Sequence, residues 1–307
     1  MAKVIRNIDK DQQEFVGTIN KIAYRFQTWE VWRDFIVMFA TALSNAVDKA
    51  HCEEREQSYM RIAGKYNKQE LALFPELCAM TVKALEVDRD RDFLGEMYMA
   101  LNLGNHWTGQ FFTPYNVCKM MSEMTCGNIV HLIQEKGCIS INDPACGAGA
   151  TLIAFANTAQ RQLTEAGYNF QNHILFTAQD IDMVTGLMCY IQLSLLGCAG
   201  YVKIANTLTN PMTEGEALTE PSKPDSCYWY TPMFFSKVWH YRRIFKAVDM
   251  MMQQVGSKLE NAAETAVSKK CDTAEAVTGK LKQEKAGASI TGFVVEKNGA
   301  ISTILKG

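Results

Sequence analysis

Residues 141–149, Ile-Asn-Asp-Pro-Ala-Cys-Gly-Ala-Gly, place a glycine-bearing turn between two segments of regular secondary structure. The apolar run 138–141 before it is typical of a strand, and the residues from Thr151 to about Leu163 are typical of a helix. Gly147 and Gly149 carry no Cβ, so the backbone can turn tightly there and approach a ligand closely. The helix that follows presents unpaired N–H groups at its beginning. This strand–turn–helix unit predicts a nucleotide-binding site.

The residues around the turn discriminate between nucleotides. The NAD fingerprint requires a third glycine three residues after the second, and Leu152 occupies that position. No Walker phosphate loop is present in the sequence. A diphosphate would be repelled by Asp143 at the end of the strand. An acidic strand end suits a ligand that carries an ammonium group or ribose hydroxyls, and S-adenosylmethionine has both.

The segment Asp-Pro-Ala-Cys-Gly-Ala-Gly resembles the cofactor motif of N6-adenine DNA methyltransferases, especially the methylation subunits of type I restriction-modification systems. Residues 109–114, Gly-Gln-Phe-Phe-Thr-Pro, resemble a second block that these enzymes place about thirty residues earlier, where it covers the methionine part of the cofactor. We expect Thr113 to be a helix N-cap and Pro114 the first residue of a helix that runs through Met124. The two blocks together imply a set of cofactor-binding residues: Gln110, Phe112, Thr113, Pro114, Asp143, Ala145, Cys146, Gly147 and Gly149.

Two further segments agree with this resemblance. The predicted strand 173–178 ends in Gln-Asp-Ile-Asp, and the family places an acidic residue at this strand tip to bind the ribose hydroxyls. We assign this role to Asp180, place Ile181 against the adenine, and expect Asp182 to cap the next helix, which runs to about Leu196. After the next strand, Gly200 to Ala205, Asn206 stands where the family usually has an aspartate. Its amide still offers a carbonyl acceptor for the adenine amino group.

The motif that would hold the methyl acceptor, the target adenine, is missing from this sequence. These enzymes hold the amino group of the flipped adenine with Asn-Pro-Pro-Phe or Asn-Pro-Pro-Tyr, and this sequence has no such motif. Asn210-Pro211-Met212 is the nearest match, but it comes early and lacks the second proline and the aromatic ring. Residues 228–232 provide aromatic rings without a preceding amide. No catalytic residue is therefore assigned.

Composition limits the class of protein and its partners. The formal net charge is −2, whereas a protein that binds DNA alone usually has a basic face. Residues 240–243 and Lys246 form the clearest basic cluster, which suits either phosphate contact or an ordinary solvated helix face.

The ten cysteines form no Cys-x-x-Cys pair, so we expect free thiols in a reducing cytoplasm and no metal site. Cys146 has no histidine nearby in sequence, which argues against a nucleophile. No apolar run is long enough to span a membrane.

Helical periodicity dominates the first hundred residues, with predicted helices over Thr28 to about Tyr66, around Glu70 to Leu85, and near Asp92 to Leu101. Residues 138–206 alternate strand and helix, which predicts a parallel sheet with its ligand at the carboxyl ends of the strands. Beyond residue 206 we expect a helix from Ser236 to about Val255, a polar helix 259–285 and a hairpin over 290–305.

These patterns predict an α/β, Rossmann-like S-adenosylmethionine-dependent methyltransferase fold with an N-terminal helical domain. The expected domains are residues 1–105 (helical), 106–235 (methyltransferase) and 236–307 (helical, with the terminal hairpin). The function implied by the resemblance is transfer of a methyl group to N6 of adenine in DNA, with sequence reading supplied by a separate specificity subunit. Three alternatives remain open: a non-catalytic cofactor- or DNA-binding relative within a restriction-modification or mobile-element complex, a methyltransferase acting on another acceptor, and a Rossmann-like domain that binds nothing.

Overall fold

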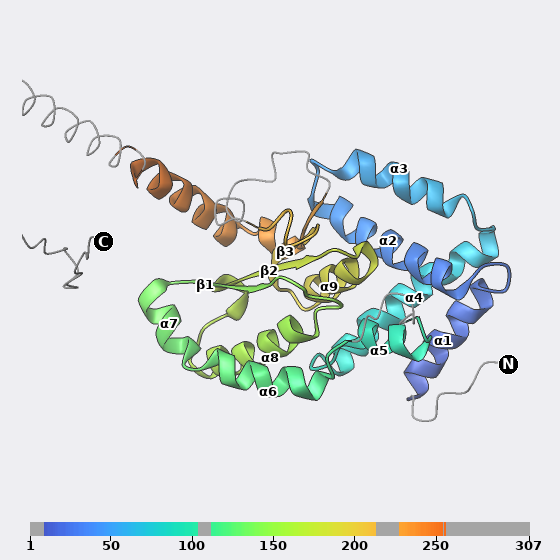
Figure 1. Ribbon diagram of the computed structural model, residues 1–307, viewed down its shortest axis with the longest axis horizontal. Helices are drawn as coiled ribbons and strands as arrows, with labels where there is room; N and C mark the ends of the chain where they lie inside the picture. The colour runs from blue at the N-terminus through green and yellow to red at the C-terminus, as the bar shows by residue number, and fades with distance from the viewer. Residues whose placement is uncertain (1–8, 104–111, 213–226, 254, 256–307) are drawn as a thin grey trace, which may run out of the picture. The chain divides into compact units, whose positions relative to one another are not determined.

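The computed structural model describes residues 9–103, 112–212, 227–253 and 255. The chain consists of two compact units, Met1–Asp249 and Met250–Gly307. The sheet and the helices up to α9 belong to the first unit (Figure 1).

A four-stranded sheet lies at the centre of this unit, in the order β1-β2-β3-β4. The strands are β1 (Ile139–Asp143), β2 (Ile174–Asp180), β3 (Ala199–Ile204) and β4 (Tyr228–Tyr230). The first three are parallel, and β4 runs antiparallel to β3. The carboxyl ends of β1, β2 and β3 therefore meet at one edge of the sheet, as the sequence predicted.

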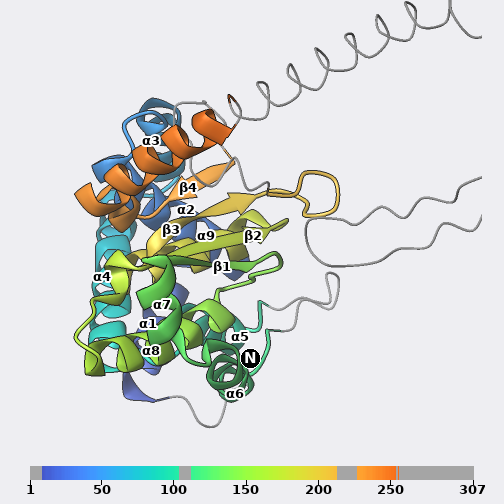
Figure 2. The same ribbon diagram turned by 90° about the vertical axis from the view of Figure 1, so that its left-hand side faces the viewer.

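Two crossover helices connect the parallel strands and confirm the predicted alternation: α8 (Ala150–Glu165) and α9 (Met183–Leu195). Both cover the same face of the sheet (Figures 1 and 2). Helices α6 (Tyr115–Cys126) and α7 (Ile129–Lys136) precede β1, and α6 packs along α8. Strands β2 and β3 are buried over almost their whole length, because neighbouring strands and α9 enclose them, whereas β1 alternates between half-buried and exposed residues.

Five helices form the N-terminal part: α1 (Lys10–Ile22), α2 (Thr28–Val47), α3 (Cys52–Ala63), α4 (Lys68–Val87) and α5 (Phe93–Ala100). The rings of Phe15, Trp32, Phe35 and Phe93 pack edge to face at its centre. Helix α2 also packs against α9. The buried side chains of the helical part and of one face of the sheet consequently form one continuous apolar core, and Leu175, Tyr201 and Tyr230 belong to a separate apolar cluster with Phe234. The domain boundary expected near residue 105 stays a prediction.

The predicted helix from Thr28 to Tyr66 is wrong in one respect, because the chain forms two helices there. It breaks after Val47, where the buried Asp48 carboxylate lies 2.8 Å from Nδ1 of His51 and accepts a hydrogen bond from Arg55 at 2.9 Å. At the break the backbone is not helical: Asp48 has φ −91° and ψ 89°, and His51 has φ −106° and ψ 2°. Helices α1 and α7 and strand β4 were not predicted.

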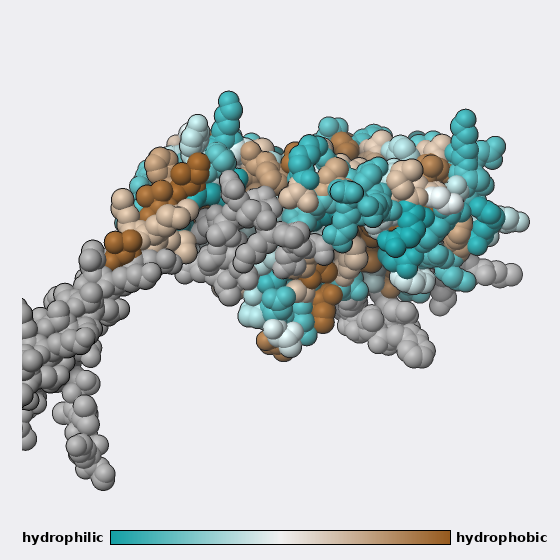
Figure 3. Space-filling model, turned by 90° about the horizontal axis from the view of Figure 1, so that it is seen from above, coloured by the Kyte–Doolittle hydropathy of each residue, from teal (hydrophilic) through white to brown (hydrophobic). Residues whose placement is uncertain are grey.

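A helix over residues 237–253 confirms the helix predicted from Ser236. Its apolar residues Tyr241, Ile244, Phe245 and Val248 are exposed. Apolar side chains gather over this helix, whereas the surface over α3 is mainly hydrophilic (Figure 3). The expected polar helix 259–285 and the hairpin 290–305 lie outside the described residues.

Candidate functional site

A cavity of about 200 Å³ lies at the carboxyl ends of β1 and β2, beside the beginning of α8. The turn 144–149 forms much of its wall and is called the glycine loop below. The cavity brings together residues that the sequence analysis proposed from separate segments. Those that line it are Phe112, Thr113, Asp143, Ala145, Cys146, Gly147 and Asp180.

Asp143 ends β1 at this cavity, and its carboxylate holds the beginning of the glycine loop. One oxygen accepts a hydrogen bond from the Ala145 N–H at 3.1 Å. The other accepts a hydrogen bond from the Thr151 hydroxyl in the first turn of α8. The side chain remains half-buried, so it can also reach a ligand in the cavity.

Asp180 ends β2 and holds the same loop from the other side. Its Oδ2 accepts a hydrogen bond from the Gly147 N–H at 2.8 Å, and its Oδ1 accepts one from the Asp182 N–H at 2.8 Å. Asp182 itself accepts a hydrogen bond from the Thr185 N–H at 2.9 Å and is the N-cap of α9, which confirms its predicted role. Ile181, between the two aspartates, is 68% exposed, so its side chain is accessible to a planar ring.

The two glycines of the loop are required for different contacts. Gly149 has a φ of 94°, and a Cβ there would lie 2.8 Å from Sγ of Cys189 on α9. Gly147 has a φ of 51°, and a Cβ there would lie 3.3 Å from the ring of Phe112. Both φ values lie in the region that favours glycine. The tight turn was predicted correctly, but Gly149 serves packing against α9.

Phe112 covers the glycine loop and lies 5.2 Å, between ring centroids, from Tyr98 of α5. Thr113 lines the cavity next to it. The predicted cap geometry is wrong by one residue: Pro114 is the N-cap of α6 and Tyr115 its first residue. Gln110 lies outside the described residues.

Asn206 and Cys146 are both used within the protein. Asn206 Oδ1 accepts hydrogen bonds from the N–H groups of Leu208 at 2.9 Å and Thr209 at 3.3 Å, and Asn206 does not line the described cavity. Its contact with adenine stays a prediction. Cys146 is buried, and its contact with Cys189, together with burial, raises the pKa of the Cys189 thiol. The raised pKa keeps the Cys189 thiol protonated near neutral pH, so Cys189 provides no thiolate.

The charge of the cavity limits the ligands that it can hold. Among the described residues that line it are two aspartates, Asp143 and Asp180, and no lysine, arginine or histidine. Two carboxylates without a nearby cation repel phosphate and attract positive charge. The first-turn N–H groups of α8 have no partner within the helix and add a small site for an anion beside them.

Asn210, the nearest match to an amine-holding asparagine, is tied into the protein. Its carbonyl oxygen accepts a hydrogen bond from Gln179 Nε2 at 2.8 Å, and its side-chain oxygen accepts one from Lys203 Nζ at 2.9 Å. Lys203 is 1% exposed, so this contact satisfies a buried cation. The rings of Tyr228, Trp229 and Tyr230 are also buried, in β4. The rings of 228–230 are therefore not available to stack on a flipped base, and the Asn210 side-chain oxygen already serves Lys203.

The basic cluster near residue 240 is largely structural as well. Arg243 is buried and donates a hydrogen bond to the Phe234 carbonyl at 2.6 Å, and Arg242 donates one to the Gly137 carbonyl at 3.2 Å. Arg243 is therefore structural, Arg242 is partly engaged, and the phosphate contact of this cluster stays a prediction.

Sequence reasoning missed Gln192 and Asp92, which connect the glycine loop to α5. Gln192 donates hydrogen bonds to the Ala148 carbonyl at 2.9 Å and to the Asp92 carboxylate at 2.7 Å. Burial raises the pKa of Asp92 to about 6. A glutamine within an otherwise apolar helix face was the available signal.

Comparison with known proteins identifies the class. Residues 89–266, more than half of the chain, match the model of the N-6 DNA Methylase family. The chain belongs to this family. Its fold is the α/β, Rossmann-like fold of methyltransferases, preceded by helices.

Two solved structures are similar at low identity. One is a type I restriction-modification methyltransferase subunit from Streptococcus thermophilus, with 18% identity and a TM-score of 0.35 over 70% of this chain and 42% of that one. The other is described as a class I S-adenosylmethionine-dependent methyltransferase from Listeria monocytogenes, with 13% identity and a TM-score of 0.37 over 80% of each chain. This chain spans less than half the length of the former. A comparison with curated proteins gave no match.

Within the described ranges, no group of histidine, cysteine or acidic residues is arranged to hold a metal ion. No helix in the same ranges has the length and apolar character needed to cross a bilayer.

Proposed function

We propose that this protein binds S-adenosylmethionine at the glycine loop and transfers its methyl group to N6 of adenine in DNA. One observation carries the proposal: Asp143 and Asp180 lie at the ends of neighbouring parallel strands and line one cavity without a cation beside them. A cofactor with a sulfonium, an ammonium group and ribose hydroxyls matches these acceptors, whereas the phosphates of NAD or ATP do not.

The residues around the cavity fit the parts of this cofactor. Asp180 would accept hydrogen bonds from the ribose hydroxyls, and Asp143 would face the ammonium group. Phe112 and Thr113 would cover the methionine part, and the exposed Ile181 would pack against the adenine. The first-turn N–H groups of α8 would face the carboxylate.

The bound cofactor supplies a methyl group on a positively charged sulfur. The chain contributes position: the two aspartates and Phe112 fix the cofactor against the glycine loop, so that an amine can approach the methyl group in line. No described residue is assigned to hold that amine.

DNA and a separate specificity subunit are the proposed partners. The net charge of −2 and the inward-directed Arg242 and Arg243 leave little basic surface near residue 240 for phosphate. A basic partner chain would supply the contacts that position DNA.

A second candidate function is cofactor binding without methyl transfer, in a complex. It is favoured by the nearest match to the amine-holding motif, in which the Asn210 side chain and the Pro211 carbonyl already accept hydrogen bonds from the buried Lys203. Both functions share the cofactor site, and they differ only in the acceptor.

The cofactor site is tested by calorimetric titration of S-adenosylmethionine. Loss of a charge-assisted hydrogen bond in Asp180→Asn should weaken binding by about 10- to 100-fold. Asp182→Asn is the matched control, because asparagine is also a good N-cap and the affinity should not change. Equal affinity of wild type and Asp180→Asn would refute the site.

Methyl transfer is tested separately, by mass spectrometry of N6-methyladenine in DNA incubated with the chain, the cofactor and candidate specificity subunits. Methylation that Asp180→Asn reduces supports the enzyme. Tight cofactor binding without methylation under every condition supports the second candidate.

A further inference from the structure

Helix α5 begins at a hydrogen-bonded group that also holds the glycine loop. Asp92, its N-cap, accepts a hydrogen bond from the Gly95 N–H at 2.9 Å and one from Gln192 Nε2 at 2.7 Å. Gln192 lies on α9 and also donates to the carbonyl of Ala148 in the loop at 2.9 Å. A single side chain thus connects the beginning of α5 with the cofactor loop.

The amide of Gln192 can adopt only one orientation here. Its two N–H groups donate to Asp92 and Ala148, and its oxygen accepts a hydrogen bond from the Leu94 N–H at 3.1 Å. The opposite orientation would place the amide oxygen against a carboxylate and a carbonyl. Gln192 is fully buried and Asp92 is 5% exposed, so water cannot replace these bonds without opening the core.

The other end of α5 reaches the same loop through aromatic rings. Tyr98 contacts Phe112, and the Phe112 ring lies against Gly147. Helix α5 therefore contacts the loop on two sides, through Gln192 at Ala148 and through Phe112 at Gly147.

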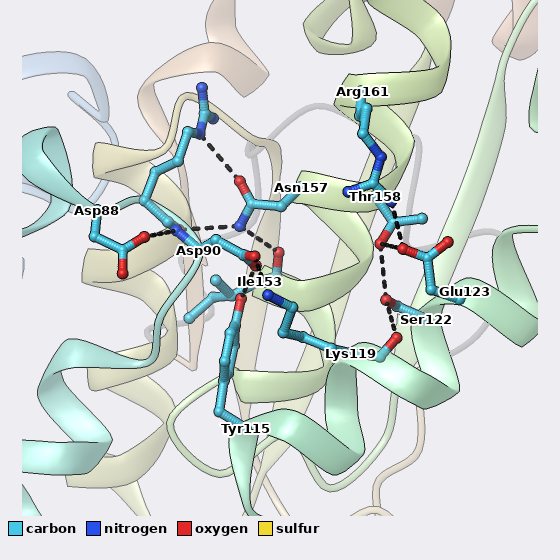
Figure 4. A network of polar contacts seen from close by, with 11 residues as sticks. Asp88, Asp90, Tyr115, Lys119, Ser122, Glu123, Ile153, Asn157, Thr158 and Arg161 are labelled. Carbon is cyan, nitrogen blue, oxygen red and sulfur yellow. Dashed lines mark hydrogen bonds and ion pairs between the residues drawn. The ribbon is translucent and has the colours of Figure 1, made fainter.

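The residues just before α5 are fixed to the methyltransferase part. Arg89 donates to the Asn157 side chain of α8 at 3.1 Å, and Asn157 donates back to the Arg89 carbonyl at 3.0 Å. Asp90 accepts hydrogen bonds from Tyr115 at 2.8 Å and, at its other oxygen, makes a short ion pair with Lys119; both donors are on α6 (Figure 4). These contacts fix the position of α5 relative to α6 and α8.

We propose that α5 sets the conformation of the glycine loop, with Asp92, Gln192 and Tyr98 as positioning residues for the cofactor. The N-terminal helices thereby control cofactor affinity without touching the cofactor. Any partner that shifts these helices would change that affinity, which makes α5 the route by which an associated subunit could regulate the site. The effect on cofactor affinity rests on the proposed function, whereas the effect of α5 on the conformation of the glycine loop does not.

The test compares Gln192→Leu, which keeps the size of the side chain and removes the amide, with Ser194→Ala on the same helix. The Ser194 hydroxyl donates a hydrogen bond to the Tyr190 carbonyl at 2.7 Å, within α9 itself. Amide hydrogen exchange of residues 147 and 148 is measured on the full chain without ligand, and S-adenosylmethionine affinity is measured by calorimetry.

In Gln192→Leu, exchange at residues 147 and 148 should be at least about tenfold faster, and affinity about 10- to 100-fold weaker, than in wild type. In Ser194→Ala both should be unchanged. Loop exchange and affinity that match those of Ser194→Ala would overturn the proposal.

Tyr98→Leu is the second variant, in case Gln192→Leu does not fold. It should accelerate exchange at residue 147, because Phe112 loses its neighbouring ring, and unchanged exchange would likewise count against the proposal. If wild type does not bind S-adenosylmethionine, the proposed function fails, while the exchange rates of the ligand-free chain still decide the role of α5.

Discussion

Gly95→Ala should reverse the usual preference of helices for alanine. Gly95 is the third residue of α5, where alanine normally stabilises a helix by about 1 kcal/mol relative to glycine. Here an added Cβ would lie 2.0 Å from Oδ2 and 2.8 Å from Oδ1 of the Asp92 carboxylate. These separations are far below van der Waals contact, so the buried carboxylate has to move.

The cost follows from the bonds that Asp92 would lose. Displacement breaks its hydrogen bonds with the Gly95 N–H and Gln192 Nε2, each worth about 1.5–3 kcal/mol for a charged acceptor. After subtraction of the gain in helix propensity, Gly95→Ala should lower the free energy of unfolding by about 2–5 kcal/mol. Because Gln192 also holds Ala148, cofactor affinity should fall with it.

Urea unfolding followed by circular dichroism measures the first effect, and calorimetry at a temperature where the variant remains folded measures the second. Gly17→Ala in α1 is the matched control, since a Cβ there meets no atom within 4 Å. That control should gain up to about 1 kcal/mol of stability. If Gly95→Ala were as stable as Gly17→Ala, the reasoning about the Asp92 carboxylate would be refuted.

Three further outcomes are expected. Arg55→Met should lower the free energy of unfolding by about 3–5 kcal/mol, because it leaves the buried Asp48 carboxylate without the Arg55 cation. In urea titrations, the double variant with Asp48→Ala should lose less stability than the two single variants lose together. Equal losses would contradict the pairing. Burial raises the pKa of Asp92 from 3.8 to about 6, and Glu96 adds to the shift. The native state therefore binds this proton more tightly than the unfolded state does, so the contribution of Asp92 to stability falls as pH rises from about 4 to about 6. The stability of Asp92→Asn relative to wild type should therefore rise by up to about 3 kcal/mol as pH rises over that range. If the urea midpoints of the two proteins differed by the same amount at every pH, Asp92 would not be a buried ionised carboxylate. Asn210→Ala should cost about 1–3 kcal/mol of stability, because Lys203 loses an acceptor, and should leave cofactor affinity unchanged; a selective loss of methylation without destabilisation would instead assign Asn210 to the amine.

The parallel part of the fold could be predicted because its signals are local. Strands β1 to β3 and helices α8 and α9 begin and end within about two residues of their predicted limits. Apolar runs, the glycine turn and the capping aspartate Asp182 each act within a few residues of the element they define. The parallel direction of the strands then follows from the helices that connect them.

The parts that were missed depend on contacts between distant residues. Strand β4 has three residues, too few to show a period, and it forms because Tyr228–Tyr230 pairs with β3. At the break between α2 and α3, the buried Asp48 pairs with Arg55, which also reaches the Tyr228 carbonyl at 2.5 Å, 173 positions away in sequence. The sequence close to Asp48 contains no pattern that predicts a contact with Tyr228.

The candidate site shows the same division. Asp143 and Asp180 were found because carboxylates at strand tips have a chemical reason to be there, and the sheet brings them to one cavity. The side chain of Asn206 accepts hydrogen bonds from the backbone that follows it, as asparagine does in turns, and its contact with adenine stays a prediction. The role of Gln192 was missed because it lies in a segment whose apolar periodicity correctly predicted a core helix.

Polar side chains, rather than the apolar core, give the contact between the N-terminal helices and the sheet its specificity. Apolar packing of α2 on α9 tolerates small shifts, since dispersion contacts are individually weak and not directional. Gln192, Asn157 and Arg55 tolerate much less, because each makes its hydrogen bonds only when partners from both parts lie at hydrogen-bond distance. Two of these contacts, those of Gln192 and Asn157, involve the short segment that leads into and begins α5, next to the cofactor loop. The helices are therefore positioned most strictly where the proposed cofactor is held.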